Sequence, residues 1–252
     1  MMLKPPISRM GGKSKLRKKI ISMIPEHTCY AEPFFGAGWI YFGKQLSAVE
    51  VINDIDGELI NLFKMLKYHA EEVTRLLNYE ISSREIFEDY KKIDLSNLTE
   101  IQRAVRLMYI ISQSFASKGT VYGYATTKGP APQIFKTEGL TALKQRLMNT
   151  YIENLDFSKI FEKYDRKHTF FFCDPPYLET DGYGCKFKID EHIKLSEILK
   201  NIQGKFLLTI NDHVKIRELY KGFNIEEVEV MYSISKENSG RRNFKELIIT
   251  NY

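Results

Sequence analysis

Thr169-Phe170-Phe171-Phe172-Cys173-Asp174-Pro175-Pro176-Tyr177 is the stretch that decides the fold. Its first five residues form a short apolar run typical of a buried strand, and the acid, two stiff prolines and tyrosine follow at the carboxyl end. A carboxylate and a backbone carbonyl can accept both protons of an exocyclic amine, while a tyrosine face stacks on a flat ring. The tetrapeptide therefore favours chemistry on an amino-bearing base, although Asp-Pro-Pro is also typical of a plain turn.

A glycine-containing segment lies upstream, at residues 31–39. It follows the short apolar stretch around Cys29 and Tyr30 and leads into the apolar run at residues 39–42. We predict a strand, a glycine turn and then a helix. Glycines there let the backbone approach a bound nucleotide, as in doubly wound α/β sheets, although the pattern is not G-x-G-x-x-G.

A third segment joins a predicted strand to acidic residues. Residues 49–52 form the strand candidate, and Asn53-Asp54-Ile55-Asp56 follows it. Because nucleotide-binding α/β folds place an acid here against ribose hydroxyls, Asp54 is the candidate ribose ligand. The alternative is that Asp54 caps a helix at residues 57–67, a role for which Asp56 is at least as well placed.

The α/β rhythm resumes after the tetrapeptide. We predict helices at residues 191–202 and 213–220, a buried strand at 206–210, and a final strand pair at 225–232 and 245–250,. Asn211-Asp212 follows a strand and could shape a ligand pocket, but we expect it to cap the next helix.

Together these segments resemble the Dam-like family of DNA adenine N6-methyltransferases, also called the D12 class, over nearly the whole chain. The matching segments, in the family's order, are Gly11-Gly12-Lys13, residues 32–38, residues 53–56, Asn154-Leu155-Asp156-Phe157, residues 174–177 and residues 246–252. The resemblance implies a doubly wound, mostly parallel α/β methyltransferase sheet with an antiparallel C-terminal hairpin and an inserted, mainly helical DNA-recognition lobe.

By the same resemblance, the expected cofactor is S-adenosylmethionine. Its expected contacts are Arg9, Lys13, Glu32, Phe34, Gly36, Gly38, Asp54, Asp156, Phe157 and Asp174. Asp174, Pro175, Pro176 and Tyr177 would hold the adenine and act in catalysis. Relatives often carry an aromatic residue where this chain has Arg9, which either lies flat over a ring or faces solvent or phosphate.

Between residues 56 and 150 apolar residues recur at three- and four-residue spacings, which predicts a helical insertion,. We therefore divide the chain into a catalytic domain, residues 1–56 and 151–252, and a target-recognition lobe, residues 57–150. The helical pattern ends in a surface loop or hairpin predicted at residues 114–130, and residues 116–137 carry lysines and tyrosines but no acid. Because such residues supply phosphate contacts and stacking, we predict DNA contact here rather than a mere connector.

The expected DNA-binding residues are Lys118, Tyr122, Tyr124, Lys128, Arg241 and Arg242. The two arginines belong to a net-basic connection that either lies near DNA or is an exposed turn. Family members that methylate GATC carry arginine and asparagine in the segment corresponding to residues 116–137, and this chain has neither there. We therefore do not assume GATC specificity.

The composition fits one substantial core with an inserted lobe, because 43% of the 252 residues are hydrophobic,. No stretch approaches a membrane span and no secretion signal is evident, so we expect a cytoplasmic protein that associates with the nucleoid through DNA. Cys29, Cys173 and Cys185 are widely spaced and odd in number, which fits neither a disulfide framework nor a zinc site,. We expect no metal.

The expected function is direct transfer of a methyl group from S-adenosylmethionine to N6 of a flipped-out adenine in DNA. Cytosine N4-methylation involves the same kind of amine and is the nearest alternative. RNA or protein amides are other substrates, and a catalytically silent nucleic-acid-binding module is a further alternative, against which the complete tetrapeptide argues. We expect double-stranded DNA as the partner and no association with a membrane. We expect a monomer, with a restriction endonuclease of the same system as a candidate partner.

Overall fold

The computed structural model describes residues 2–9, 11–127, 129, 139–179, 187–233 and 241–252, with the backbone alone at 230–233 and 241–244. Contacts divide the chain into two compact units, each made of separate segments. The first unit contains Met1–Lys13, Gly36–Lys44 and Asp56–Asn154, and the second contains Ser14–Phe35, Gln45–Ile55 and Leu155–Tyr252. The catalytic and target-recognition roles assigned to two domains stay predictions.

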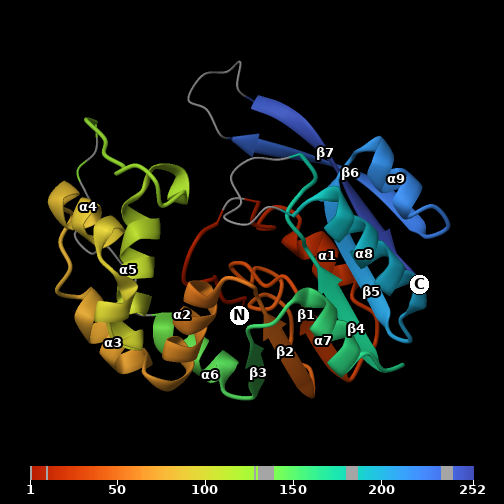
Figure 1. Ribbon diagram of the computed structural model, residues 1–252, viewed down its shortest axis with the longest axis horizontal. Helices are drawn as coiled ribbons and strands as arrows, with labels where there is room; N and C mark the ends of the chain where they lie inside the picture. Colours follow the sequence, from red (N-terminus) through yellow and green to blue (C-terminus); the bar gives the residue numbers. More distant parts are fainter. Residues whose placement is uncertain (1, 10, 128, 130–138, 180–186, 234–240) are drawn as a thin grey trace. The chain divides into compact units, whose positions relative to one another are not determined.

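One seven-stranded sheet has the order β3-β2-β1-β4-β5-β7-β6 (Figure 1). Its strands are β1 (Cys29–Glu32), β2 (Val49–Asn53), β3 (Thr150–Glu153), β4 (Thr169–Cys173), β5 (Lys205–Asn211), β6 (Asn224–Ser233) and β7 (Arg241–Thr250). β1 is parallel to β2 and β4, and β4 is parallel to β5, whereas β7 is antiparallel to β5 and β6. The predicted mostly parallel α/β sheet with an antiparallel C-terminal hairpin is confirmed.

The helices of the second unit cover both faces of its strands. They are α1 (Arg17–Met23), α7 (Phe157–Tyr164), α8 (Ile189–Asn201) and α9 (Val214–Leu219). Figure 1 shows α7 and α8 in front of the strands and α1 behind them. The predicted helices at 191–202 and 213–220 correspond to α8 and α9.

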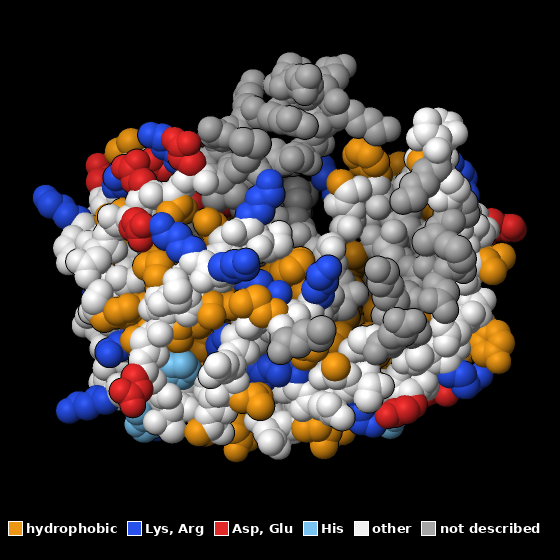
Figure 2. Space-filling view, turned by 180° about the vertical axis from the view of Figure 1, so that it is seen from behind, with side chains coloured by type: hydrophobic (Ala, Val, Ile, Leu, Met, Phe, Trp, Pro, Cys, Tyr) orange, Lys and Arg blue, Asp and Glu red, His pale blue; other side chains and the backbone are white. Residues whose placement is uncertain are grey.

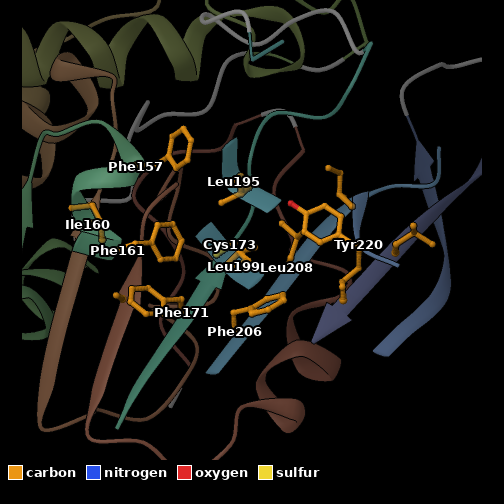
Figure 3. Packing of buried hydrophobic residues seen from close by; sticks show 14 of the residues in the cluster. Phe157, Ile160, Phe161, Phe171, Cys173, Leu195, Leu199, Phe206, Leu208 and Tyr220 are labelled. Carbon is orange, nitrogen blue, oxygen red and sulfur yellow. The ribbon is translucent and has the colours of Figure 1, made fainter. Parts of the chain in front are cut away.

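An apolar cluster joins α7, α8 and α9 to one face of the sheet (Figure 3). Phe161 of α7 packs on Phe171 of β4 with ring centroids 4.6 Å apart, and Leu195 of α8 is fully buried in the same cluster. Burying each large apolar side chain contributes about 1.5–3 kcal/mol. This packing fixes β4, and with it the start of the tetrapeptide.

The first unit is mainly helical. Its helices are α2 (Gly57–Tyr68), α3 (Ala70–Leu77), α4 (Arg84–Lys92), η1 (Leu95–Asn97), α5 (Glu100–Gln113), η2 (Phe115–Ser117) and α6 (Leu140–Leu147). α5 packs against α2, α3 and α4, and α6 packs against α2 and α3. A reciprocal capping box between Thr99 and Gln102 starts α5, because each side chain satisfies a backbone N–H that the helix leaves open,.

The predicted helix at residues 39–42 is wrong. This segment forms hydrogen-bonded turns, in which the N–H of Phe42 donates to Gly38 and that of Lys44 donates to Ile40. Gly38 has a left-handed φ of 77°, which interrupts the backbone just before the run,. The guanidinium of Arg146 lies 3.8 Å from the ring centre of Tyr41 and holds the turn. Strand β3 is also an element that the sequence pattern did not predict.

Within the described part of the chain, no helix combines the length and apolar character that crossing a bilayer requires.

Candidate active site

Three parallel strands of the second unit end at one edge of the sheet. Ala31 of β1 lies opposite Val51 of β2 and Phe171 of β4. Three residues after each of these aligned residues come, in the same order, Phe34, Asp54 and Asp174. The three segments therefore leave the sheet at the same level. The neighbours β2 and β4 on either side of β1 make this a topological switch point, where doubly wound α/β proteins bind ligands.

The tetrapeptide follows β4 directly, as predicted. Asp174 is partly buried, and its Oδ1 accepts a hydrogen bond of 2.8 Å from the hydroxyl of Thr209 on β5. Pro175 is buried and Tyr177 packs against the apolar cluster. Burial, together with the negative charges of Asp174 and Glu32, raises the pKa of the Cys173 thiol well above its ordinary value. The end of β4 is therefore an anionic environment.

Asn211 holds the chain just beyond the tetrapeptide. Its Oδ1 accepts from the N–H of Leu178 and its Nδ2 donates to the carbonyl of Leu178, both at 3.1 Å. Leu178 is itself buried. The side chain of Asn211 thus fixes both backbone groups of the residue that follows Tyr177.

The expected capping role of Asn211-Asp212 is wrong. His213 caps α9 by accepting a hydrogen bond of 3.2 Å from the N–H of Lys215. Both carboxylate oxygens of Asp212 instead accept from Arg217, at 2.7 and 2.9 Å, and this bonding lowers the pKa of Asp212. The bidentate pair with Arg217 takes Asp212 away from the helix end.

An aromatic cluster forms beyond the end of β1. The ring centroids of Phe34 and Phe157 are 5.2 Å apart, and Phe187 lies 5.6 Å from each. Phe34 and Phe187 remain partly exposed, while Phe157 is buried at the start of α7. The cluster provides an apolar surface at the predicted cofactor site, and Phe187 is a member that the sequence did not reveal.

Asn53 ties together two of the predicted cofactor segments. It is buried, and its Nδ2 donates to the carbonyls of Pro33 at 2.9 Å and Leu155 at 3.0 Å. Its Oδ1 accepts from the N–H of Leu155 at 2.8 Å. The segment after β1 and the segment before α7 are therefore held against the end of β2. The sequence placed Asn53 in a matching segment but did not reveal this role, because its partners lie far away along the chain.

Two of the expected cofactor residues have structural partners of their own in the second unit. Glu32 is buried and its carboxylate accepts a hydrogen bond of 2.5 Å from the hydroxyl of Tyr30. Asp156 caps α7 through the N–H of Ser158 and pairs with Lys194 at 3.0 Å. Partial burial raises the pKa of Asp156, but the bonds from Ser158 and Lys194 outweigh that effect and the pKa is lowered.

Asp56, rather than Asp54, caps α2. Its Oδ1 accepts from the N–H groups of Glu58 and Leu59 at 3.1 and 3.2 Å. Its Oδ2 pairs at 2.6 Å with Arg9, a contact that neither interpretation of Arg9 anticipated. Asp54 is thus not required as the cap, and the ribose role stays a prediction.

The remaining expected cofactor residues belong to the first unit. Lys13 is buried and its Nζ donates to the carbonyl of Gly11 at 2.9 Å. A side chain at Gly12 would come within 2.7 Å of the Trp39 ring, which explains the glycine. Gly36 and Gly38 have φ of 52° and 77°, values that favour glycine,.

The expected DNA-binding residues are described only in part. Tyr122 forms an isolated bridge with Ser114, and the guanidinium of Arg84 on α4 lies 5.0 Å from the Tyr122 ring and 5.3 Å from the Tyr124 ring. Tyr124 is 74% exposed, and Lys118 is exposed too. Sequence reasoning missed Arg84.

Lys128 lies outside the described residues, and so do the side chains of Arg241 and Arg242. The net charge of the chain is +5. Figure 2 shows a face with Lys and Arg side chains across its middle and most Asp and Glu side chains toward its margins. No group of three or more His, Cys, Asp or Glu side chains that could hold a metal is found among the described residues.

The mostly parallel α/β sheet, with its antiparallel C-terminal hairpin and the tetrapeptide directly after β4, is consistent with a methyltransferase fold. Residues 10–234 match the model of the D12 class N6 adenine-specific DNA methyltransferases. The chain belongs to this family, and it is an adenine-specific DNA methyltransferase.

Curated relatives align with nearly the whole chain. The type II methyltransferase M.CviBI of Paramecium bursaria Chlorella virus NC1A is 30% identical over 99% of this chain and 100% of its own. The type II methyltransferase M1.LlaDCHI of Lactococcus lactis subsp. cremoris is 28% identical over 99% and 96%. The DNA adenine methylase of Haemophilus influenzae is 26% identical over 97% and 92%.

Proposed function

We propose that this enzyme transfers a methyl group from S-adenosylmethionine to N6 of an adenine that has swung out of double-stranded DNA. The observation that carries this proposal is that Asp174 leaves the sheet at the same level as Phe34 and Asp54. The residues proposed to bind the nucleotide cofactor and the residue proposed to bind the amine therefore lie at one edge of the sheet.

The residues of the second unit fit the cofactor chemically. The partly exposed rings of Phe34 and Phe187 suit a flat adenine, and the Asp54 carboxylate suits ribose hydroxyls,. When bound, S-adenosylmethionine supplies an electrophilic methyl group on a positively charged sulfur. The anionic surroundings of Cys173 support binding of such a cation. Glu32, Asp156 and Phe157 in this unit, and Arg9, Lys13, Gly36 and Gly38 in the first, complete the proposed contacts.

The tetrapeptide would activate the amine by accepting its protons. Hydrogen bonds from the amine to the Asp174 carboxylate and the Pro175 carbonyl reduce the delocalisation of the nitrogen lone pair into the ring. The nitrogen is then a better nucleophile. A free carboxylate, with a pKa of about 3.9, is too weak a base to deprotonate a neutral amine first. Asp174 therefore acts by orientation and electrostatics, the proton leaves after methyl transfer, and Tyr177 stacks on the flipped base.

We further propose that residues 116–137 recognise the target, with Lys118, Tyr122, Tyr124 and Lys128 on duplex DNA and Arg241 and Arg242 as further contacts. Lysine contacts to phosphates and tyrosine contacts to bases support this assignment. The two relatives named type II methyltransferases support a restriction endonuclease as partner. We also propose that the enzyme works as a monomer, and that it acts in the cytoplasm in association with the nucleoid, because its substrate is DNA.

A labelling experiment tests the proposed chemistry. The purified protein is incubated with unmethylated duplex DNA and methyl-labelled S-adenosylmethionine, and the nucleosides are analysed by mass spectrometry. We expect labelled N6-methyladenine, and we expect Asp174→Ala to abolish it while leaving the circular dichroism spectrum unchanged. Asp190→Ala removes an exposed acid of α8 and should remain active. Labelled N4-methylcytosine alone, or no labelled base, contradicts the proposal.

A further inference from the structure

Strand β5 carries two polar side chains at alternate positions near its carboxyl end. Leu208 and Ile210 belong to the apolar cluster, whereas Thr209 and Asn211 alternate with them. Side chains two residues apart in a strand point to the same side of the sheet. Thr209 and Asn211 therefore form a pair, and each makes its hydrogen bonds to the segment that follows β4.

Thr209 acts on the first residue of the tetrapeptide. Its hydroxyl is fully buried and donates to Oδ1 of Asp174 at 2.8 Å, while the Cys173 carbonyl lies 3.5 Å away. A hydrogen bond from a buried hydroxyl to a charged oxygen is short and strong, and it restrains rotation of the carboxylate. The position of Oδ2 is restrained with it.

Asn211 acts on the residue after the tetrapeptide. Its two hydrogen bonds to the N–H and carbonyl of Leu178 imitate the pairing of a neighbouring strand,. Glu179, the next residue, has a left-handed φ of 57°, so the chain turns directly after the point that Asn211 holds. The backbone of Pro175 and Pro176 is stiff by itself. A restraint at each end therefore restricts the whole tetrapeptide.

We propose that Thr209 and Asn211 are positioning residues for methyl transfer, and that they orient Asp174 and hold the backbone beyond Tyr177. The proposal rests on the proposed role of Asp174 in accepting the target amine. In this proposal neither residue touches the substrate, and both act through the segment that follows β4. Preorganised groups accelerate the chemical step because they need not rearrange during the reaction.

The first test separates the hydroxyl of Thr209 from its shape. Thr209→Val keeps the branched side chain and removes the donor, whereas Thr209→Ser keeps the donor. Since a hydrogen bond to a charged group contributes about 1.5–3 kcal/mol, we expect Thr209→Val to lower kcat about 10- to 100-fold. Thr209→Ser should recover most of kcat. Because Asp174 is also an expected cofactor contact, the Kd for S-adenosylmethionine is measured as well, and it should change less than kcat in either variant.

Thr169→Val is the matched control. Thr169 is also buried in the second unit, and its hydroxyl donates to the carbonyl of Tyr164 at 2.8 Å, away from the tetrapeptide. This variant should lose stability and keep its kcat. If Thr209→Val fails to fold, Thr209→Ala tests the same hydroxyl with less crowding. A kcat equal to wild type in a folded variant without the Thr209 hydroxyl overturns its role, and so does a Thr209→Ser variant as slow as Thr209→Val.

Asn211 has an equally close control in Asn251. Asn251 accepts from the N–H of Phe206 at 2.9 Å and donates to the carbonyl of Gly204 at 3.0 Å, at the other end of β5. Asn211→Leu should lower kcat with little change in the Kd for S-adenosylmethionine, while Asn251→Leu should reduce only stability. Equal kcat values for these two variants overturn the role of Asn211.

Turnover by the wild-type protein shows whether the proposed function fails or only the positioning role of Thr209 and Asn211 fails. If the wild-type protein forms no N6-methyladenine, the proposed function fails. If the wild-type protein forms it and the folded Thr209 and Asn211 variants match its kcat, only the positioning role fails.

Discussion

Asp54 leaves the sheet three residues beyond Val51, at the level of Phe34 and Asp174. If its carboxylate accepts hydrogen bonds from ribose hydroxyls, Asp54→Ala should weaken binding of S-adenosylmethionine by about 1–3 kcal/mol, which calorimetry measures directly. Thr99→Ala is the control, because it removes the cap of α5 and should cost about 1 kcal/mol of stability with no effect on cofactor affinity,. Unchanged affinity in Asp54→Ala contradicts the ribose role.

At the scale of single residues, the sequence revealed those side chains whose meaning depends on near neighbours. Asp174 follows the apolar strand β4 directly, and Asp54 follows a predicted strand by one residue, so their position at a strand end could be predicted. Asn53, Thr209 and Asn211 have partners in other segments, chosen by the register between strands. Register depends on packing across the whole sheet, and one residue of slip would replace every partner.

Helix α8 contains a histidine whose burial makes stability depend on pH. His192 is fully buried, its ring lies edge-on to Phe187 at 4.7 Å, and neither ring nitrogen has a partner among the described residues. Burial lowers the pKa of His192 from 6.5 to about 4. Between these values the unfolded chain binds the proton and the folded chain does not. Acidification through this window therefore favours unfolding.

We expect His192 to remove roughly 2–3 kcal/mol from the free energy of unfolding as the pH falls from 6.5 to 4,. His192→Leu should be less sensitive to this change, because leucine cannot take up the proton. Urea unfolding at several pH values measures the slope. Ser196→Ala offers a control, since it changes a buried side chain of the same helix that takes up no proton and should keep the wild-type slope. Identical slopes for wild type and His192→Leu contradict the prediction.

At the scale of elements, apolar runs were the reliable signal. β4 and β5 are buried along most of their length and are mainly apolar, with Thr209 as the polar exception inside β5, so their sequences predicted strands. β3 contains Tyr151 and Glu153 around one aliphatic residue, and only its first residue is fully buried. Its membership in the sheet is decided by tertiary contacts. The run at residues 39–42 is apolar because it is largely buried, as the face of a packed helix would be, but Gly38 before it sets a turn.

At the scale of the whole molecule, periodicity located the helical insertion but not the short segments that pack with it. Residues 1–13 and 36–44 belong to the same compact unit as residues 56–154. Such short pieces contain too few turns to show a helical or strand period. Their contacts, such as the hydrogen bonds between Tyr41 and Arg146, join residues far apart in the chain.

We expect a patch of the first unit that combines an arginine with two tyrosines to contact DNA. The guanidinium of Arg84 lies within 5.3 Å of the ring centres of Tyr122 and Tyr124, so a cation and two aromatic rings form one surface patch. Such a patch offers a phosphate contact or a bidentate contact to guanine, together with stacking surfaces. Arg75 on α3 is the matched control, because its guanidinium also lies near an exposed tyrosine, 5.9 Å from the ring centre of Tyr79.

We expect Arg84→Ala to weaken binding to duplex DNA by about 1–3 kcal/mol, with the affinity for S-adenosylmethionine unchanged, because the lost charge and contact face the nucleic acid alone. Fluorescence anisotropy with a labelled duplex over a range of salt concentrations measures this loss. A phosphate contact should reduce the salt dependence, since fewer counterions are released, whereas a base contact should make the loss depend on the DNA sequence. If Arg84→Ala and Arg75→Ala bind every duplex equally at every salt concentration, Arg84 only supports the two tyrosines and recognition lies elsewhere on the enzyme.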